Sequence, residues 1–395
     1  METSRRYDLV LCGATGFTGG LTADYLAANA PAGMRWALSG RNRSKLDAVA
    51  ARLAAAAPQA PKPDVIEADA GDPAAMREVA EAARVVITTV GPYALYGGPL
   101  VAACAAAGTD YCDLTGEPEF VDRVWVDHHA EAERSGARLV HCCGFDSIPH
   151  DLGAYFTVKQ LPKRVPLTVN GYVKTNLRFS GGTYHSAING FSRARQTLNA
   201  AKERRRLEPR VEGRQVHGAP PRIRHDEDLG GWAVPLPTID GAVVRRSAGA
   251  LDRYGPDFTY GHNMVTKRLA TVGALAGSVG TAGVLAQLPP ARKLLLKLKA
   301  QGEGPSEAVR ERSWFKVVFV GEGGGKRVVT EVSGGDPGYD ETSKMLGESG
   351  LCLAFDELPA TSGQVTTAAA MGDALLERLQ KAGIEFRVIE TSVSG

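Results

Sequence analysis

The first 142 residues alternate between short apolar runs and longer stretches that repeat with helical spacing. The apolar runs predict six strands, at 7–12, 35–39, 64–68, 85–90, 110–113 and 138–142. The run at 85–90 is rich in β-branched residues and carries no charge after Arg84, as expected of a strand buried on both faces. Strands that alternate with helices predict a parallel, doubly wound α/β sheet.

Polar residues mark where the intervening helices begin. Ser44 stands before a helical stretch as a predicted N-cap, and Asp72-Pro73 combines a capping carboxylate with a proline in the first turn. Further helices are predicted at 99–107 and 119–135.

A glycine-rich loop joins the first strand to the first helix. It reads GATGFTG over residues 13–19. At this position Gly13 permits a tight turn, Gly16 lets the backbone approach a pyrophosphate, and Gly19 lets helix and strand pack closely. Because the helix N-terminus offers free N–H groups to an anion, we expect a dinucleotide here, with Thr15, Phe17 and Thr18 also in contact. A turn without a ligand is the alternative.

The end of the second strand indicates which dinucleotide binds. Residues 39–45 read SGRNRSK and contain no carboxylate to bind a ribose 2′-hydroxyl. Arg41 can pair with a 2′-phosphate, and Arg43 or Lys45 can add positive charge. This pattern favours NADP(H) over NAD. The expected contacts are Ser39, Gly40, Arg41 and Asn42, with Asp69 near the adenine.

Two loops follow later strands at the edge where the nicotinamide should lie. Gly91-Pro92-Tyr93 follows the fourth strand, and Gly144-Phe145-Asp146-Ser147 follows the sixth. Hydride transfer also needs a group that stabilises charge or gives a proton. Tyr93, Tyr96, Asp146 and Ser147 are the candidates, although either tyrosine can instead pack on the cofactor. His150, His185 and Ser186 are weaker ones.

Several longer motifs resemble the saccharopine dehydrogenase-like oxidoreductases, and within them the bacterial trans-acting enoyl reductases. They are GPYALYGGPLVAACAAAGTDYCD at 91–113, CGFDSIPHDLG at 143–153 and VSGGDPGYDETSKM at 332–345. The resemblance implies a Rossmann-type NADP-binding domain at 1–150, an inserted α/β (α+β) substrate and dimerisation domain at 151–335, and C-terminal helices at 336–395 that return to the first domain. It departs from the family pattern at His150, where serine is commoner.

Three functions remain open at this stage. The resemblance implies an NADPH-dependent enoyl reductase that transfers hydride to a C=C bond of an acyl, polyketide or lipid-like thioester. A saccharopine-type enzyme would instead act on a C=N bond and need arginines such as Arg178 or Arg193 for substrate carboxylates. The third function is a non-catalytic NADP-binding protein of lipid surfaces.

The second half is less regular. We expect a strand at 165–174, a long helix from 180 that becomes basic at 204–206, a hairpin of 314–320 with 326–332, helices at 341–358 and 364–382, and a last strand at 386–389. The segment 193–224 holds ten Lys or Arg residues. It is either a solvated helix end or a docking surface for an acidic carrier protein or synthase.

Composition excludes some classes. The net charge of +2 gives no support for nucleic-acid binding, and 44% hydrophobic residues is ordinary for a globular protein. The six cysteines lack metal or disulfide spacing, so we expect buried thiols and no metal. The N-terminus has no signal-peptide core, which predicts a cytoplasmic protein. Residues 269–288 are uncharged, and a buried or surface helix with peripheral membrane contact is favoured there over a span.

Overall fold

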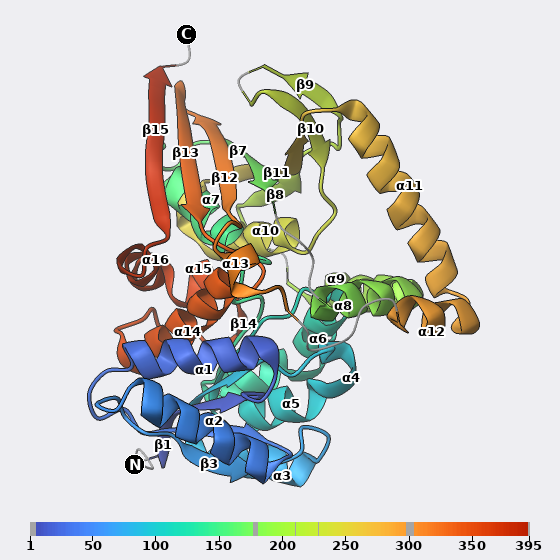
Figure 1. The fold of residues 1–395 in the computed structure, drawn as a ribbon. Coiled ribbons are helices and arrows are strands. Elements are labelled where there is room, and N and C mark those ends of the chain that lie inside the picture. The colour runs from blue at the N-terminus through green and yellow to red at the C-terminus, as the bar shows by residue number, and fades with distance from the viewer. Residues whose placement is uncertain (1–4, 177–180, 210, 228, 298–303, 394–395) are drawn as a thin grey trace.

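The computed structural model describes residues 5–176, 181–209, 211–227, 229–297 and 304–393. Two β-sheets lie one above the other, with helices between and around them (Figure 1). The lower sheet is formed mainly by the first third of the chain, and the upper sheet by residues after 166. We call the corresponding halves of the molecule the nucleotide lobe and the second lobe.

The sheet of the nucleotide lobe has seven strands, all parallel, in the order β14-β6-β5-β4-β1-β2-β3. Its first six strands are β1 (Tyr7–Cys12), β2 (Trp36–Gly40), β3 (Asp64–Glu67), β4 (Ala83–Thr88), β5 (Asp110–Asp113) and β6 (Arg138–Val140). All six residues of β1 are buried, which explains its unbroken apolar run. The strand order reverses between β1 and β4, where doubly wound sheets bind nucleotides.

Helices cover both faces of this sheet. They are α1 (Phe17–Asn29), α2 (Arg43–Ala56), α3 (Pro73–Ala82), α4 (Tyr93–Tyr96), α5 (Gly98–Ala107) and α6 (Pro118–Ser135). Asp72 caps α3 as expected, accepting a hydrogen bond from the Ala74 backbone N–H at 2.9 Å. The expected cap of α2 was wrong by two positions. Asn42, not Ser44, is the N-cap, because its side chain accepts the Lys45 N–H at 3.0 Å.

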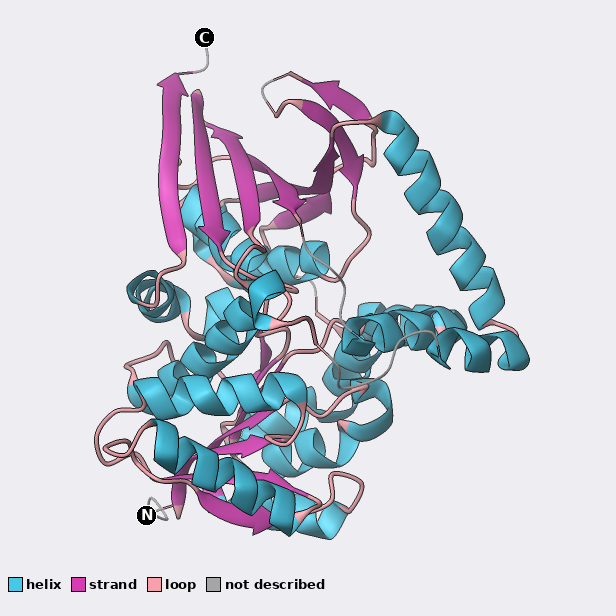
Figure 2. Ribbon diagram, in the orientation of Figure 1, coloured by secondary structure: helices cyan, strands magenta, loops and turns pink. Residues whose placement is uncertain are grey.

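The second lobe contains a mixed sheet of eight strands (Figure 2). Its order is β15-β13-β12-β7-β11-β10-β9, and β8 pairs with β11. The strands are β7 (Leu167–Thr175), β8 (Gln215–Gly218), β9 (Arg224–Asp226), β10 (Gly231–Pro235), β11 (Asp257–Thr266), β12 (Phe315–Gly323), β13 (Lys326–Gly334) and β15 (Glu385–Val393). The predicted hairpin is β12 with β13, paired antiparallel.

The helices of the second lobe lie between the two sheets and along one side. They are α7 (Ile148–Val158), α8 (Gly181–Ser192), α9 (Ala194–Leu207), α10 (Asp240–Ala250), the 3-10 helix η1 (Asp252–Tyr254), α11 (Leu269–Ala286), α12 (Pro289–Lys297) and α13 (Glu307–Arg310). The long helix expected from residue 180 is two helices. Arg193, with φ −109° and ψ 19°, departs from helical geometry between α8 and α9.

The C-terminal segment contributes to both sheets. It consists of α14 (Asp340–Phe355), β14 (Gly363–Val365), α15 (Thr367–Ala370), α16 (Gly372–Lys381) and β15. Helix α14 packs on α1 and β4, and β14 extends the parallel sheet beside β6. The single helix expected at 364–382 was wrong. Gly363 (φ +83°) and Gly372 (φ +45°) adopt left-handed backbone that interrupts the helical path.

The two lobes meet around the buried carboxylate of Asp151 in α7. It accepts hydrogen bonds from the Ser247 hydroxyl of α10 at 2.5 Å, the Thr367 hydroxyl at 2.7 Å and the Ala368 N–H at 2.9 Å. One side chain thereby joins α7, α10 and α15. The expected limit of the first domain, residue 150, falls just inside α7.

Helices α11 and α12 project along one side of the molecule (Figure 1). Large apolar side chains on this pair are exposed, among them Val279, Val284, Leu288 and Leu294. Across the part of the chain that the structure describes, no helix combines the length and apolarity that crossing a bilayer requires. All six cysteines are buried and unpaired, as expected.

Candidate cofactor and substrate site

A cavity of about 1610 Å³ opens at the carboxyl edge of the parallel sheet and extends into the second lobe. The glycine loop and the loops after β2, β3, β4 and β6 line one end. Residues of α8, α9, β11 and the 236–240 segment line the other end. A long cavity with these two ends can hold a dinucleotide and a second molecule together.

The glycine loop has the backbone geometry that its sequence implies. Gly13 has a φ of +91°, and its N–H donates to the Ser39 carbonyl at 2.9 Å. A Cβ atom on Gly19 would lie 2.1 Å from the Gly13 carbonyl oxygen, so only glycine lets α1 begin this close to the loop. A Cβ on Gly16 would meet only that oxygen, at 3.4 Å. Gly16 therefore borders open cavity. Thr15, Phe17 and Thr18 line it too.

The basic loop after β2 contains one arginine without a partner. Ser39, Gly40 and Arg41 line the cavity, and Arg41 makes no hydrogen bond or ion pair with the described residues. Arg43 instead pairs with Asp47 at 3.0 Å on α2. The Asn42 side chain is occupied by its capping role, whereas Asp69 lines the cavity and accepts the Gly71 N–H at 2.9 Å. This leaves Arg41 available to a 2′-phosphate.

Arg41→Ala should weaken NADPH binding by about 1–3 kcal/mol, the scale of a charge-assisted hydrogen bond, and leave NADH affinity nearly unchanged. Isothermal titration with both cofactors measures the difference. Arg43→Ala is the matched control, because its guanidinium is already paired with Asp47 and should change little. Equal losses for NADPH and NADH in Arg41→Ala would contradict the assignment.

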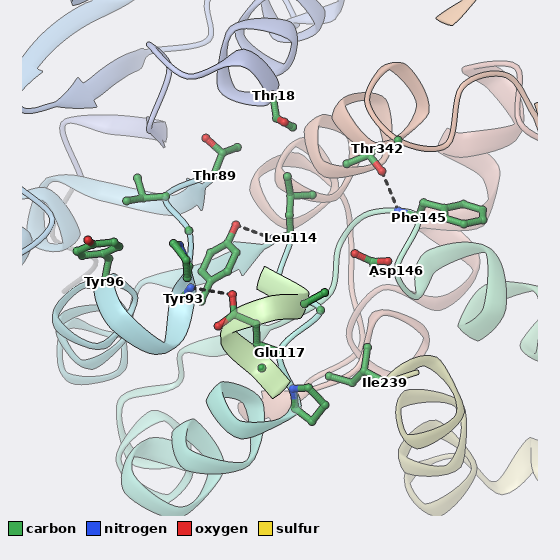
Figure 3. A pocket seen from close by; sticks show the side chains of 18 of the residues that line it. Thr18, Thr89, Tyr93, Tyr96, Leu114, Glu117, Phe145, Asp146, Ile239 and Thr342 are labelled. Atoms are coloured by element: carbon green, nitrogen blue, oxygen red, sulfur yellow. Dashed lines mark hydrogen bonds between the residues drawn. The ribbon is translucent and has the colours of Figure 1, made fainter. Parts of the chain in front are cut away.

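The loop after β4 is fixed by Glu117 (Figure 3). The Gly91-Pro92 peptide bond is cis. The carboxylate of Glu117 accepts the Tyr93 N–H at 3.0 Å and the Ala94 N–H at 2.9 Å, and so satisfies the first free N–H groups of α4. Gly91 and Pro92 line the cavity beside it.

The two candidate tyrosines of this loop differ in environment. The Tyr93 hydroxyl donates to the Thr88 carbonyl at 3.0 Å and accepts the Leu114 N–H at 3.2 Å. Burial raises the pKa of Tyr93 well above its ordinary value. This geometry favours an anchoring role for Tyr93 over proton donation. Tyr96 is 48% exposed at the cavity and keeps its hydroxyl accessible.

The loop after β6 faces this one across the cavity (Figure 3). The Phe145 N–H donates to the Thr342 hydroxyl of α14 at 3.0 Å, which fixes the loop to the C-terminal segment. A Cβ on Gly144 would lie 2.9 Å from the Leu114 side chain, so the loop also packs tightly at its start. Ser147 is fully buried and directs its hydroxyl at Asp240, 3.3 Å away, rather than lining the cavity.

Asp146 is the carboxylate of this loop that reaches the cavity (Figure 3). Solvent contacts it through the cavity, but protein surrounds it on the other sides. Desolvation, followed by the negative charge of Asp240, raises the pKa of Asp146 to about 7. A carboxyl group with this pKa is protonated in a large fraction of molecules at neutral pH and can act as an acid.

Other candidates lie apart from this arrangement. Arg193 forms an ion pair with Glu119 at 2.5 Å, which already engages its guanidinium. Arg178 and the side chain of Ser186 are outside the described residues, and His185 is not among the residues that line the cavity. The sequence had singled out neither Glu117 nor Thr342, nor Asp240 and His262 of the second lobe. Their spacing carries no local motif, because they meet the site only through the fold.

The parallel sheet, the glycine loop and the unpaired Arg41 define a two-domain dinucleotide-dependent oxidoreductase. Comparison with known proteins gives the family. Residues 9–140 match the saccharopine dehydrogenase NADP binding domain. A Mycobacterium tuberculosis protein whose name places it among the trans-acting enoyl reductases is 40% identical over 98% of both chains. A Mycobacterium ulcerans trans-acting enoyl reductase is 37% identical over 97% of this chain and 98% of its own.

A solved structure shares the fold. Saccharopine dehydrogenase (L-Glu forming) from Saccharomyces cerevisiae superposes with a TM-score of 0.52 over 97% of this chain and 99% of that chain, at 12% identity. The chain belongs to the saccharopine dehydrogenase-like oxidoreductases, and NADP(H) is its cofactor.

Proposed function

We propose that the protein reduces a C=C bond conjugated to the carbonyl of an acyl thioester, with NADPH as the hydride source. The observation that carries the proposal is the character of the substrate end of the cavity. Its lining includes Val173, Phe191, Leu198, Leu236 and Met264, all apolar. An extended acyl chain would bury its methylene groups against such a surface, at about 0.8 kcal/mol for each one.

Charge argues against an amino-acid substrate. Of the described residues that line the cavity, Arg41 is the one arginine or lysine, and it lies at the cofactor end. An enzyme that binds the carboxylates of an amino acid needs cations near the reacting carbon. Arg193, which could have served, is paired with Glu119. The saccharopine-type reaction is therefore supported less well than enoyl reduction.

NADPH supplies the hydride when it is bound. The chain supplies the rest of the chemistry. Gly16 and the start of α1 offer backbone N–H groups to the pyrophosphate, and Arg41 offers its guanidinium to the 2′-phosphate. Glu117 keeps the loop after β4 in place, and Asp146 holds a proton at its carboxyl group across the cavity. Proton donation from Asp146 would complete saturation of the double bond.

The proposed substrate is held by a carrier protein or synthase. Exposed Arg195, Lys202, Arg205 and Arg206 lie on α9, the helix that also contributes Ala194, Thr197 and Leu198 to the cavity wall. A basic helix beside the cavity suits an acidic carrier that delivers an acyl chain. A homodimer, a cytoplasmic location and peripheral membrane contact stay predictions.

A substrate panel tests the proposal. Enoyl thioesters of increasing chain length should be reduced with NADPH, with KM falling as the chain grows, while imines of amino acids should not be. Ala187→Trp places an indole on the cavity side of α8 and should raise KM for a long enoyl thioester about tenfold, the loss of roughly two methylene contacts.

The same variant should leave KM for a four-carbon enoyl thioester nearly unchanged. Ala270→Trp, at the exposed start of α11 and outside the cavity lining, carries the same change as a control. Turnover of amino-acid imines in preference to enoyl thioesters would overturn the proposal.

A further inference from the structure

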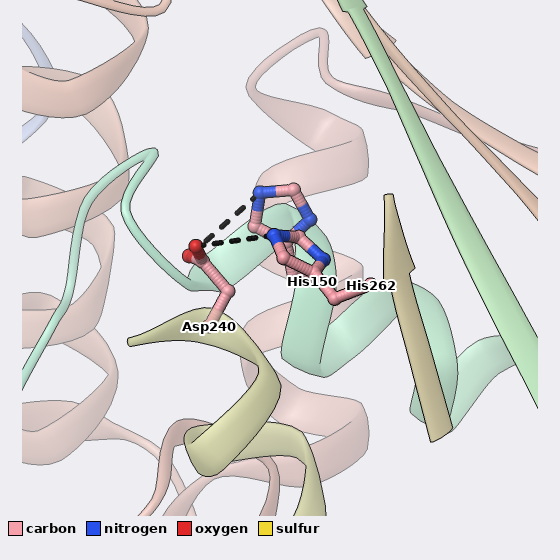
Figure 4. Close-up of side chains that lie close together, drawn as sticks. All are labelled: His150, Asp240 and His262. Atoms are coloured by element: carbon pink, nitrogen blue, oxygen red, sulfur yellow. Dashed lines mark ion pairs between the residues drawn. The ribbon is translucent and has the colours of Figure 1, made fainter. Parts of the chain in front are cut away.

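Two histidines and an aspartate from separate elements of the second lobe come together at the cavity wall (Figure 4). They are His150 of α7, Asp240 at the start of α10 and His262 of β11. The His150 Nε2 lies 3.8 Å from the Asp240 Oδ1, and the His262 Nε2 lies 3.4 Å from the Asp240 Oδ2. One nitrogen or oxygen from each side chain lies within 4.8 Å of the others.

The carboxylate of Asp240 is buried without a strong cation. In the described ranges no lysine or arginine lies within 4.0 Å of it; its ion-pair neighbours are the two histidines. The hydroxyls of Ser147 and Thr238 donate hydrogen bonds to its two oxygens. Hydroxyl groups orient a carboxylate but do not neutralise it, and buried charges in proteins are usually paired or coordinate metals.

The imidazoles supply an independent observation. The Nδ1 atoms of both His150 and His262 are buried and have no hydrogen-bond partner in the described part of the chain. The two rings lie 4.9 Å apart at 83°, with the edge of His150 also against Phe145. Unsatisfied buried nitrogens in a polar cluster point to an ion or water that completes it.

We propose that His150, Asp240 and His262 bind a divalent transition-metal ion of the zinc class. Two imidazole nitrogens and one carboxylate are a donor set that catalytic zinc sites use, and they leave a coordination position for a further ligand. Tetrahedral zinc ligands lie about 3.3 Å apart, because each is about 2.0–2.1 Å from the ion. Side-chain movements of about 1–1.5 Å would bring the three groups to that spacing.

The place of the cluster indicates what else the ion would meet. His150 and Asp240 line the cavity, so the open coordination position would be reachable by an oxygen of a bound substrate. Positive charge there would polarise a carbonyl group. That role rests on the proposed enoyl reduction, whereas the metal site itself rests on the cluster alone.

Metal binding can be measured without turnover. The full-length protein, stripped with a chelator, is titrated with Zn²⁺ by calorimetry and with Co²⁺ by visible absorption, which reports the coordination geometry. We expect one ion per chain. Asp240→Asn and His262→Gln should each weaken binding by more than about 100-fold, since even residues outside the coordination sphere contribute about 10–100-fold.

His217→Gln is the matched control. His217 also lies near an aspartate, Asp257, at 3.9 Å, but it is exposed and outside the cluster, so its loss should not change the affinity. Circular dichroism shows whether each variant folds; if Asp240→Asn does not, His262→Gln and the wild-type Co²⁺ spectrum decide the question.

Absence of saturable binding of either ion to the wild-type protein would overturn the inference. So would binding that both cluster variants leave undiminished. Enoyl reductase activity without metal binding would reject the metal site alone. Stoichiometric metal binding with no reduction of any enoyl thioester would reject the proposed function alone.

Discussion

Replacement of Asp146 by asparagine should lower kcat for enoyl thioester reduction by about 10²–10⁴-fold, the usual contribution of a positioned general acid. Asparagine keeps the shape of the side chain but has no proton of suitable acidity. NADPH affinity should change little, because Asp146 lies on the loop after β6, away from the glycine loop. Stopped-flow measurement of NADPH oxidation separates the chemical step from binding.

The pH dependence gives the same test an independent readout. Burial raises the pKa of Asp146 to about 7, so its carboxyl group holds the proton below that value and loses it above. For a general acid the active form is the protonated one, and kcat of the wild-type protein should therefore fall as the pH rises through about 7. Asp146→Asn should lose this decline.

Tyr96→Phe is the comparison variant, since Tyr96 has the other accessible hydroxyl at the cavity. We expect it to retain most activity. A large loss in Tyr96→Phe together with an unaffected Asp146→Asn would transfer the proton-donating role to Tyr96.

Gly16→Val should abolish detectable NADPH binding while the protein stays folded. A Cβ on Gly16 meets only the Gly13 carbonyl, at 3.4 Å, so the apoprotein has room for it. The branched side chain would instead fill the space that the pyrophosphate needs against the loop. Calorimetric titration with NADPH and the melting temperature of the apoprotein measure the two effects separately.

Gly19→Val provides the contrast. Its Cβ would stand 2.1 Å from the Gly13 carbonyl oxygen and 2.7 Å from the Thr89 hydroxyl, so this variant should lose stability as well as binding. Undiminished NADPH affinity in a folded Gly16→Val protein would mean that the phosphates bind elsewhere.

The cofactor half of the site could be predicted because its determinants are local. Gly13, Gly16 and Gly19 lie on one loop, and Arg41 follows the next strand, so the βαβ pattern is enough to place them together. The same pattern placed Asp146 at the correct edge of the sheet. It could not tell that the Tyr93 hydroxyl is held between the Thr88 carbonyl and the Leu114 N–H.

The second lobe could be predicted only in part. Asp240 and His262 come from elements 22 residues apart and reach His150 through packing of α10 and β11 against α7, which no periodic pattern records. The strands at 215–266 were likewise not predicted. Most are short and half exposed, such as β8 and β9, and so lack a clear apolar alternation.

The division of the C-terminal segment between both sheets bears on how the protein assembles during synthesis. Strand β14 completes the parallel sheet next to β6, although more than 220 residues separate Val140 from Gly363. Strand β15 then pairs with β13 in the other sheet. Neither sheet is complete until almost the whole chain has left the ribosome, and pairings this distant in sequence form slowly. The open edges of β6 and β13 would meanwhile be exposed to other chains, so chaperones that shield strand edges should raise the yield of native protein.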